Sequence, residues 1–233
     1  MKTIGIIGAM DSEVSLLRSK LDIILVKQVA GVDFYMGKLS GNNVVVARCN
    51  IGKVNAAVCA QILIDMYGVD YIINTGVAGA ISLELDIGDI VVSSDLAHHD
   101  FDTSGVGDVK YVNPSLDESF FRADDRLVKL AKDSCDAVLA RNKAIVGRIA
   151  TGDQFIMSNE DKTRIWNDLG ALCVEMEGAA IAQACYLNNV PFIVIRSISD
   201  KADNSAHMSF EQFVDEASDI SARVVEEMLN GMQ

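Results

Sequence analysis

The stretch from Cys173 to Gln183 constrains the fold of this chain most strongly. A short apolar run there ends at two carboxylates, Glu175 and Glu177, and small residues then open a helical pattern. This order of strand, acidic turn and helix is typical of α/β proteins, which bind ligands at the carboxyl ends of their strands. The two acids can share a site only if the strand continues through both; if the helix has already begun, they lie about 200° apart around it. The structural alternative is that they only stabilise the N-terminus of the helix.

Apolar runs and helical patterns alternate along the whole chain. The runs predict strands at residues 3–7, 23–29, 32–39, 44–49, 71–74, 87–92, 144–149 and 190–195. The helical patterns cover residues 11–20, 51–67, 126–140, 159–169, 177–188 and 208–229. Asp11 or Ser12 can cap the first helix. Because we find no repeat, low-complexity segment or linker, we predict one α/β domain spanning residues 1–233.

Composition excludes several classes of protein. Half of the residues are hydrophobic, which fits parallel strands that are buried on both faces. No apolar run approaches the roughly 20 residues of a membrane helix, and Met1–Met10 reads as a first strand without a signal-peptide cleavage site. The net charge of −13 argues against nucleic acid or a membrane surface as a partner. Five cysteines without a C-x-x-C motif indicate buried thiols in a reducing compartment, so we expect a cytoplasmic protein.

Neither a dinucleotide cofactor nor a metal is predicted. The spacing Gly5-x-x-Gly8 is not the G-x-G-x-x-G fingerprint, and the carboxylate of Glu13 would repel a pyrophosphate. The irregular segment 95–124 contains possible metal ligands, but neighbours in extended chain point in opposite directions and no H-E-x-x-H motif accompanies them. These ligands are His98, His99, Asp100 and Asp102. We expect this segment to be a lid or an interface element.

Segments 75–80, 151–156 and 196–200 each follow a predicted strand and are expected to be loops. Four charged residues also follow predicted strands. These residues are Glu13, Glu177, Arg196 and Asp200. Strand ends share one edge of such a sheet, and buried charges are costly unless they serve a function. Acid–base and hydroxyl-binding groups of this kind are used in sugar chemistry. In the loop after residue 149, Phe155 can stack on a flat ligand or belong to the core.

Nine short motifs carry a resemblance that extends nearly from end to end. They are Gly5-Ile6-Ile7-Gly8-Ala9-Met10 with Glu13, Gly52-Lys53-Val54-Asn55-Ala56-Ala57, Ile73-Asn74-Thr75-Gly76, Gly88-Asp89-Ile90-Val91, Gly152-Asp153-x-Phe155-Ile156, Val174-Glu175-Met176-Glu177, Val190-Pro191-Phe192, Arg196-x-x-Ser199-Asp200 and Met208-Ser209-Phe210. With them the chain resembles the 5′-methylthioadenosine/S-adenosylhomocysteine nucleosidases of the nucleoside phosphorylase family. The resemblance implies a three-layer α/β/α sandwich around a mixed, largely parallel twisted sheet.

The resemblance also implies roles for individual residues. Asp200 is the general acid that protonates N7 of the purine, and Ser199 orients it. Glu13 positions and activates water with the help of Arg196. The ribose is held by Met176 and Glu177, and the adenine by Phe155 and the backbone of Ile156. The 5′-alkylthio pocket and further backbone contacts come from Met10, Ile51, Val77, Ala78 and Phe210.

The implied activity is hydrolysis of the N-glycosidic bond of methylthioadenosine, S-adenosylhomocysteine and 5′-deoxyadenosine, in methionine salvage and the recycling of S-adenosylmethionine by-products. The family's homodimers, without a cofactor, bring a partner loop near the 5′ pocket. Three alternatives stay open: a 6-amino-6-deoxyfutalosine nucleosidase, a phosphate-dependent purine nucleoside phosphorylase and a non-catalytic nucleoside-binding protein. A phosphorylase is disfavoured because no Arg precedes Thr75-Gly76 to bind phosphate.

Overall fold

The computed structural model describes residues 2–232, so both end residues of the predicted 1–233 domain lie outside the described part. One mixed sheet connects its strands in the order β10-β6-β8-β9-β5-β1-β4-β3-β2, and β7 pairs with β6. The strands are β1 (Thr3–Gly8), β2 (Asp22–Val29), β3 (Val32–Leu39), β4 (Asn42–Arg48), β5 (Tyr71–Ala80), β6 (Ile90–His98), β7 (Phe121–Arg122), β8 (Ala144–Thr151), β9 (Cys173–Glu175) and β10 (Phe192–Asp200).

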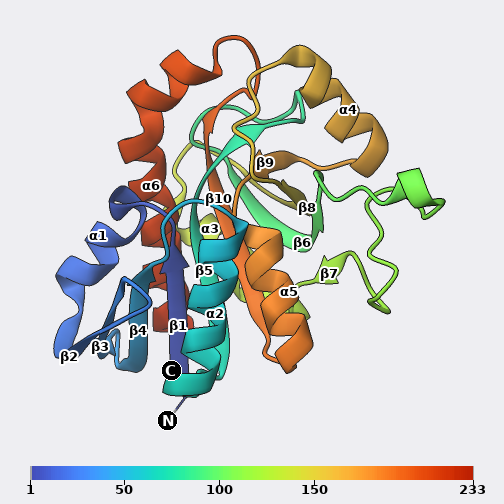
Figure 1. Ribbon diagram of the computed structural model, residues 1–233. Coiled ribbons are helices and arrows are strands. Elements are labelled where there is room, and N and C mark those ends of the chain that lie inside the picture. The colour runs from blue at the N-terminus through green and yellow to red at the C-terminus, as the bar shows by residue number, and fades with distance from the viewer. Residues whose placement is uncertain (1, 233) are drawn as a thin grey trace.

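Helices cover both faces of this sheet (Figure 1). They are α1 (Asp11–Lys20), α2 (Lys53–Tyr67), α3 (Asp125–Val138), α4 (Asn159–Leu169), α5 (Gly178–Asn188) and α6 (Ala206–Gly231), with a short 3-10 helix, η1 (Ser104–Val106). α2 packs against α5 on one face, while α6 packs against α1 and α3 on the other. The predicted three-layer α/β/α arrangement is therefore confirmed.

β5 is the centre of the sheet. It pairs in parallel with β1 on one side and with β10 on the other, and β9 joins it near its carboxyl end. Because β10, β6, β8 and β9 also pair in series, these strands and β5 close into a ring. Every residue of β10 is buried, as continuous apolar runs in a covered sheet predict. The topology brings the carboxyl ends of β1, β5 and β10 together.

Two strands are longer than predicted. β5 continues through residues 75–80 and β10 through residues 196–200, segments that we expected to be loops. The two segments pair with each other, with Arg196 opposite Gly76 and Asp200 opposite Gly79. Polar and glycine residues do not end a strand when its backbone bonds remain satisfied. β6 also differs, since it begins at Ile90 and continues to His98.

The remaining features of the core agree with the sequence. All five cysteines are buried and unpaired, as predicted. β2, β3 and β4 pair as an antiparallel meander, and the turn between β3 and β4 is at residues 40–41. No helix within residues 2–232 combines the length and apolar character needed to cross a membrane.

Candidate active site

A cavity of about 100 Å³ lies where β1, β5 and β10 end, beside the turn between β9 and α5. Its lining combines four carboxylates with apolar and aromatic side chains. The lining residues are Ala9, Met10, Glu13, Ile51, Val77, Ala78, Gly79, Phe155, Val174, Glu175, Met176, Glu177, Ser199, Asp200 and Phe210. Every residue predicted for the site lines this cavity except Arg196 and Ile156.

Glu13 is held at the cavity by backbone N–H groups from two segments. Its Oε2 accepts from the N–H groups of Ala9, at 2.6 Å, and Met10, at 3.0 Å. Its Oε1 accepts from the N–H of Val77 in β5, at 3.0 Å. The carboxylate is therefore fixed between the start of α1 and β5.

This arrangement also explains how α1 begins. The N-cap residue is Met10, and the Glu13 side chain reaches back to its N–H group. The prediction that Asp11 or Ser12 caps the helix is therefore wrong. Burial raises the pKa of Glu13, although the charge of Arg196 and the backbone N–H groups act in the opposite direction.

Arg196 lies beneath the cavity in β10 and is only 1 % exposed. Nε and Nη2 of its guanidinium both donate to the same oxygen of Glu175, Oε2, and Nη2 also donates to Asn74 Oδ1 at 2.7 Å. The carboxylate of Glu177 lies 3.8 Å from Nη2. Burial alone would lower the pKa of Arg196, but Glu175, Glu13 and Glu177 together raise it. The guanidinium is therefore charged throughout the physiological range.

Gly76 makes the approach of Glu13 and Arg196 possible. A Cβ atom at this position would lie 2.2 Å from Glu13 Oε1 and 2.5 Å from Arg196 Nη1. Both side chains are buried and hydrogen-bonded, so neither has free space to move away.

We expect Gly76→Ala to lower kcat by about 100-fold, because displacement of a positioned group by roughly 1 Å can cost that much. The added methyl group must push Glu13 or Arg196 out of place. Turnover should be measured beside thermal unfolding, so that activity refers to folded protein. A folded Gly76→Ala variant with wild-type kcat would show that the site tolerates this displacement.

Glu175 and Glu177 occupy the turn between β9 and α5. The strand ends at Glu175, and the helix begins at Gly178 after Glu177 as its N-cap residue. Both acids line the cavity although the strand does not continue through Glu177, so the predicted condition for a shared site is wrong. Burial and the charge of Glu175 raise the pKa of Glu177. Burial would also raise the pKa of Glu175, but Arg196 and hydrogen bonds hold it below its ordinary value.

Asp200 ends β10 and is 2 % exposed. Its Oδ1 accepts from the N–H of Ala202 at 2.8 Å, and its Oδ2 accepts from the Ser199 hydroxyl at 2.9 Å. Burial raises the pKa of Asp200 and outweighs these two hydrogen bonds. The side chain therefore retains a proton at pH values at which an exposed aspartate is ionised.

Two aromatic rings lie at the rim of the cavity. Phe155 and Phe210 pack edge to face, with ring centroids 5.5 Å apart, and Ile51 is more than half exposed beside them. Ile156 is different, because its buried side chain belongs to a small second core and not to the cavity lining. The predicted contact of its backbone with adenine stays a prediction.

Sequence reasoning missed two buried polar residues that support the site. Asn74 accepts from Arg196 and donates to the carbonyl of Ile7 at 2.9 Å. The hydroxyl of Thr151 donates to Glu175 and accepts from the N–H of Ala179 at 2.8 Å. Thr151 is the last residue of β8, and Asn74 is the last residue of the run 71–74 that was predicted as a strand; a polar residue at the end of an apolar run is a signal in the sequence that we did not use.

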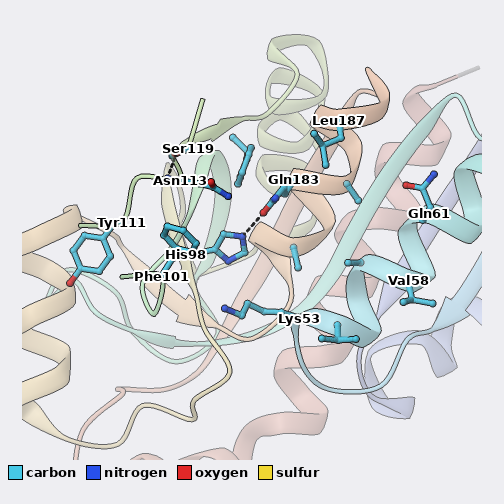
Figure 2. Close-up of a pocket in the computed structure, with 15 residues that line it drawn as sticks. Lys53, Val58, Gln61, His98, Phe101, Tyr111, Asn113, Ser119, Gln183 and Leu187 are labelled. Atoms are coloured by element: carbon cyan, nitrogen blue, oxygen red, sulfur yellow. Dashed lines mark hydrogen bonds between the residues drawn. The ribbon is translucent and has the colours of Figure 1, made fainter. Parts of the chain in front are cut away.

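The irregular segment 95–124, which contains the possible metal ligands, forms contacts with the rest of the protein. His98 hydrogen-bonds Gln183 in α5 at 3.0 Å (Figure 2). Asp100 forms an ion pair with Lys53 at 2.6 Å. Within the described chain, no three His, Cys, Asp or Glu side chains are grouped so that they could hold a metal ion.

Comparison with known proteins identifies the family. The phosphorylase superfamily model matches residues 3–230. The 5′-methylthioadenosine/S-adenosylhomocysteine nucleosidase of Hydrogenovibrio crunogenus is 40% identical over 232 residues, which is 99% of each chain. The structure of such a nucleosidase from Neisseria meningitidis, in complex with methylthio-immucillin-A, has a TM-score of 0.95 at 36% identity and covers 99% of this chain and 100% of its own. Futalosine hydrolase of Helicobacter pylori has a TM-score of 0.93 at 33% identity, with 99% and 98% covered. The chain therefore belongs to the phosphorylase superfamily, within its branch of 5′-methylthioadenosine/S-adenosylhomocysteine nucleosidases.

Proposed function

We propose that this protein hydrolyses the N-glycosidic bond of 5′-methylthioadenosine and S-adenosylhomocysteine, releasing adenine and the 5′-substituted ribose. The observation that carries the proposal is the pairing of Asp200 and Glu13 at one cavity. Asp200 is buried, which raises the pKa of its carboxyl group, and the carboxylate of Glu13 is fixed by three N–H groups. An acid and a base in one small site are what hydrolysis of a glycosidic bond requires.

In this proposal Asp200 acts on the leaving group. Adenine leaves poorly until its ring is protonated, and Asp200 supplies that proton to N7. The Ser199 hydroxyl donates to the carboxyl oxygen Oδ2, which leaves the proton free to point toward the cavity. The rise in the pKa of Asp200 matches this role, because a general acid must still hold its proton near the working pH.

Glu13 acts on the other side of the reaction. As the purine leaves, the sugar develops positive charge, which a nearby carboxylate stabilises. Glu13 also accepts a proton from the attacking water. Beside it, Arg196 Nη1 is buried with no hydrogen-bond partner in the described chain, so this N–H group is suited to a water or ribose oxygen.

The rest of the cavity binds the nucleoside. Glu177 accepts from the ribose hydroxyls and Met176 packs against the sugar, while Phe155 stacks on adenine. The cavity of about 100 Å³ is smaller than the roughly 300–1,000 Å³ of most ligand sites. We therefore expect the rim at Phe155, Phe210 and Ile51 to move apart when a nucleoside enters.

Phosphorolysis is the less favourable reaction at this site. No Lys or Arg occurs among the residues that line the described cavity, and four carboxylates do. Arg196, the nearest guanidinium, already contacts Glu175 and lies within 3.8 Å of Glu177. A phosphate dianion would meet net negative charge here, whereas neutral water would not.

A second candidate substrate is 6-amino-6-deoxyfutalosine. It is favoured by the TM-score of 0.93 with the futalosine hydrolase of Helicobacter pylori. The acid, base and ribose-binding groups serve both reactions, so the two substrates differ only at the 5′ end. That end lies at the rim, near Ile51 and Phe210.

The deciding assay measures adenine release from methylthioadenosine with and without phosphate, together with the sugar product. We expect equal rates and free methylthioribose in both conditions. A sugar 1-phosphate that forms only with phosphate would make the protein a phosphorylase. Adenine release from aminofutalosine alone would select the second substrate, and nucleoside binding without any release would indicate a binding protein.

We also propose that the protein is a homodimer joined on the face of α2 and α5. Val54, Val58 and Leu187 are exposed there, around a hollow of about 560 Å³. Figure 2 shows residues of both helices and of segment 99–120 that line this hollow, and one of them, Lys53, is two residues from the rim residue Ile51. A partner on this face could therefore complete the 5′ end of the site.

The dimer is tested by sedimentation equilibrium. We expect a mass of twice the 25.1 kDa chain. Val58→Glu, which places a charge on the apolar face, should shift the protein toward the monomer and raise KM for nucleosides with a 5′ substituent. A wild-type protein that sediments as a single chain at micromolar concentration would contradict the proposal.

The chemistry of the rest of the chain fits a cytoplasmic enzyme. Five buried, unpaired cysteines are typical of a reducing compartment. The net charge of −13 disfavours polyanionic partners such as nucleic acid.

A further inference from the structure

Glu175 is the most heavily hydrogen-bonded side chain at the cavity. Its two oxygens accept from five donors: the Thr151 hydroxyl, the N–H groups of Glu177, at 3.1 Å, and Gly178, at 2.8 Å, and both Nε and Nη2 of Arg196. A protonated carboxyl group would place a hydrogen against one of these donors. Glu175 is therefore held as an anion.

Glu177 has the opposite environment. One backbone N–H group, from Gly52 at 2.8 Å, donates to its carboxylate, and the guanidinium of Arg196 lies 3.8 Å away. With so few donors nearby, lone pairs of Glu177 remain available to a ligand in the cavity. One acid of the pair is thus committed to the protein, and the other is open to the cavity.

Thr151 links this arrangement to the helix. Its hydroxyl donates to Glu175 and accepts from the N–H of Ala179, in the first turn of α5. Glu175 itself accepts from the N–H of Gly178, the first residue of that helix. The chain that carries Glu177 is therefore held by Glu175 before it and, through the first turn of α5, by Thr151 and Glu175 after it.

We propose that Glu175 is a positioning residue, whose carboxylate holds Arg196 and the first turn of α5 so that Glu177 faces the ribose. The inference rests on the proposed function, because it assigns Glu175 a part in the same reaction. In the proposed reaction, Glu175 touches no reacting atom. It acts through Arg196 and Glu177, and Thr151 fixes Glu175 in turn.

Three variants test the inference. Glu175→Gln keeps the size of the side chain but turns an NH₂ group against a donor. Thr151→Val removes the hydroxyl and keeps the shape, whereas Thr151→Ser keeps the hydroxyl. We expect kcat/KM to fall by about 100-fold in Glu175→Gln and less in Thr151→Val, with a rise in KM in both, and near wild-type values in Thr151→Ser. The rise in KM reports a displaced ribose contact, which a simple loss of folded protein would not produce.

The pH profile separates positioning from a purely structural role. The negative charge of Glu175 raises the pKa of Glu177, and removing it also frees Arg196 to stabilise ionised Glu177. Because Glu177 must be ionised to accept from the ribose, the acid limb of kcat/KM should move to lower pH in Glu175→Gln. In Thr151→Val the charge of Glu175 remains, so this limb should stay in place.

Titration of the Glu177 carboxyl by ¹³C NMR in nucleoside-free protein makes the same measurement without turnover. A lower pKa in Glu175→Gln supports the inference, even if the wild-type protein releases no adenine and the proposed function fails. An unchanged pKa of Glu177 in folded Glu175→Gln, together with an unchanged KM in both Glu175→Gln and Thr151→Val, would overturn it while leaving the nucleosidase assay intact. If Glu175→Gln does not fold, Thr151→Val against Thr151→Ser decides the question by KM.

Discussion

Replacing Asp200 by asparagine should lower kcat for adenine release by about 10²- to 10⁴-fold, the range that a general acid contributes. Asparagine has the same shape, so its Oδ1 can still accept from the N–H of Ala202 while its NH₂ group donates to Ser199. It has no proton acidic enough to transfer to N7 of the purine. Methylthioadenosine should therefore bind with a Kd close to that of the wild type, as calorimetry can measure.

The expected loss of kcat in Asp200→Asn should not result from a loss of folded protein. Burial raises the pKa of Asp200 above its value in the unfolded chain, so the stabilisation from the protonated form is lost as pH rises through the raised pKa. The asparagine side chain of the variant carries no charge at any pH. The melting temperature of Asp200→Asn should therefore equal or exceed that of the wild type at neutral and higher pH.

The matched control is Asp203→Asn. Asp203 lies three residues further on, bonds to Ser205 and does not line the cavity. Its charge contributes only modestly to the raised pKa of Asp200, so the variant should retain most of its turnover. Wild-type kcat in Asp200→Asn, or loss of binding together with turnover, would contradict the role of Asp200 as the acid. A matching decline of wild-type kcat as pH rises through the pKa of Asp200 would support it.

The sequence predicted the layers of the fold because apolar runs report burial directly. It predicted the convergence of Glu13, Glu177 and Asp200 because strands of a parallel array end at one edge. It did not predict that β5 and β10 continue through residues 75–80 and 196–200. A run of polar and glycine residues looks like a loop in sequence, and only the pairing of these two strands with each other shows that it is not.

The support of the site was harder to predict than its lining. The resemblance assigned roles to residues that face the ligand, and nearly all of them line the cavity. Asn74 and Thr151 touch only other residues of the protein, so no ligand chemistry pointed to them. The prediction of the N-cap residue of α1 was wrong for a related reason. Glu13 satisfies the helix start, and a sequence rule that searches the N-cap position cannot see a bond made from three residues later.

Glu13→Gln should also lower kcat by about 10²- to 10⁴-fold, and here we expect part of the effect to appear in stability. Both oxygens of Glu13 accept from backbone N–H groups, so the NH₂ group of glutamine must face either Val77 or the pair Ala9 and Met10. A buried donor facing a donor costs about 1–3 kcal/mol, which should lower the melting temperature by several degrees.

The catalytic part of the Glu13→Gln effect is separable from the structural part. Glutamine cannot take a proton from water, and it offers less negative charge to the developing sugar cation, so kcat per folded molecule should fall while adenine itself still binds. The matched control is Asp11→Asn on the same helix, which breaks an exposed ion pair with Arg18 that is worth little. If folded Glu13→Gln kept the wild-type kcat, water would be activated without a carboxylate at this position. Arg196 Nη1, the remaining polar group beside Gly76, would then be the group to examine for holding the water.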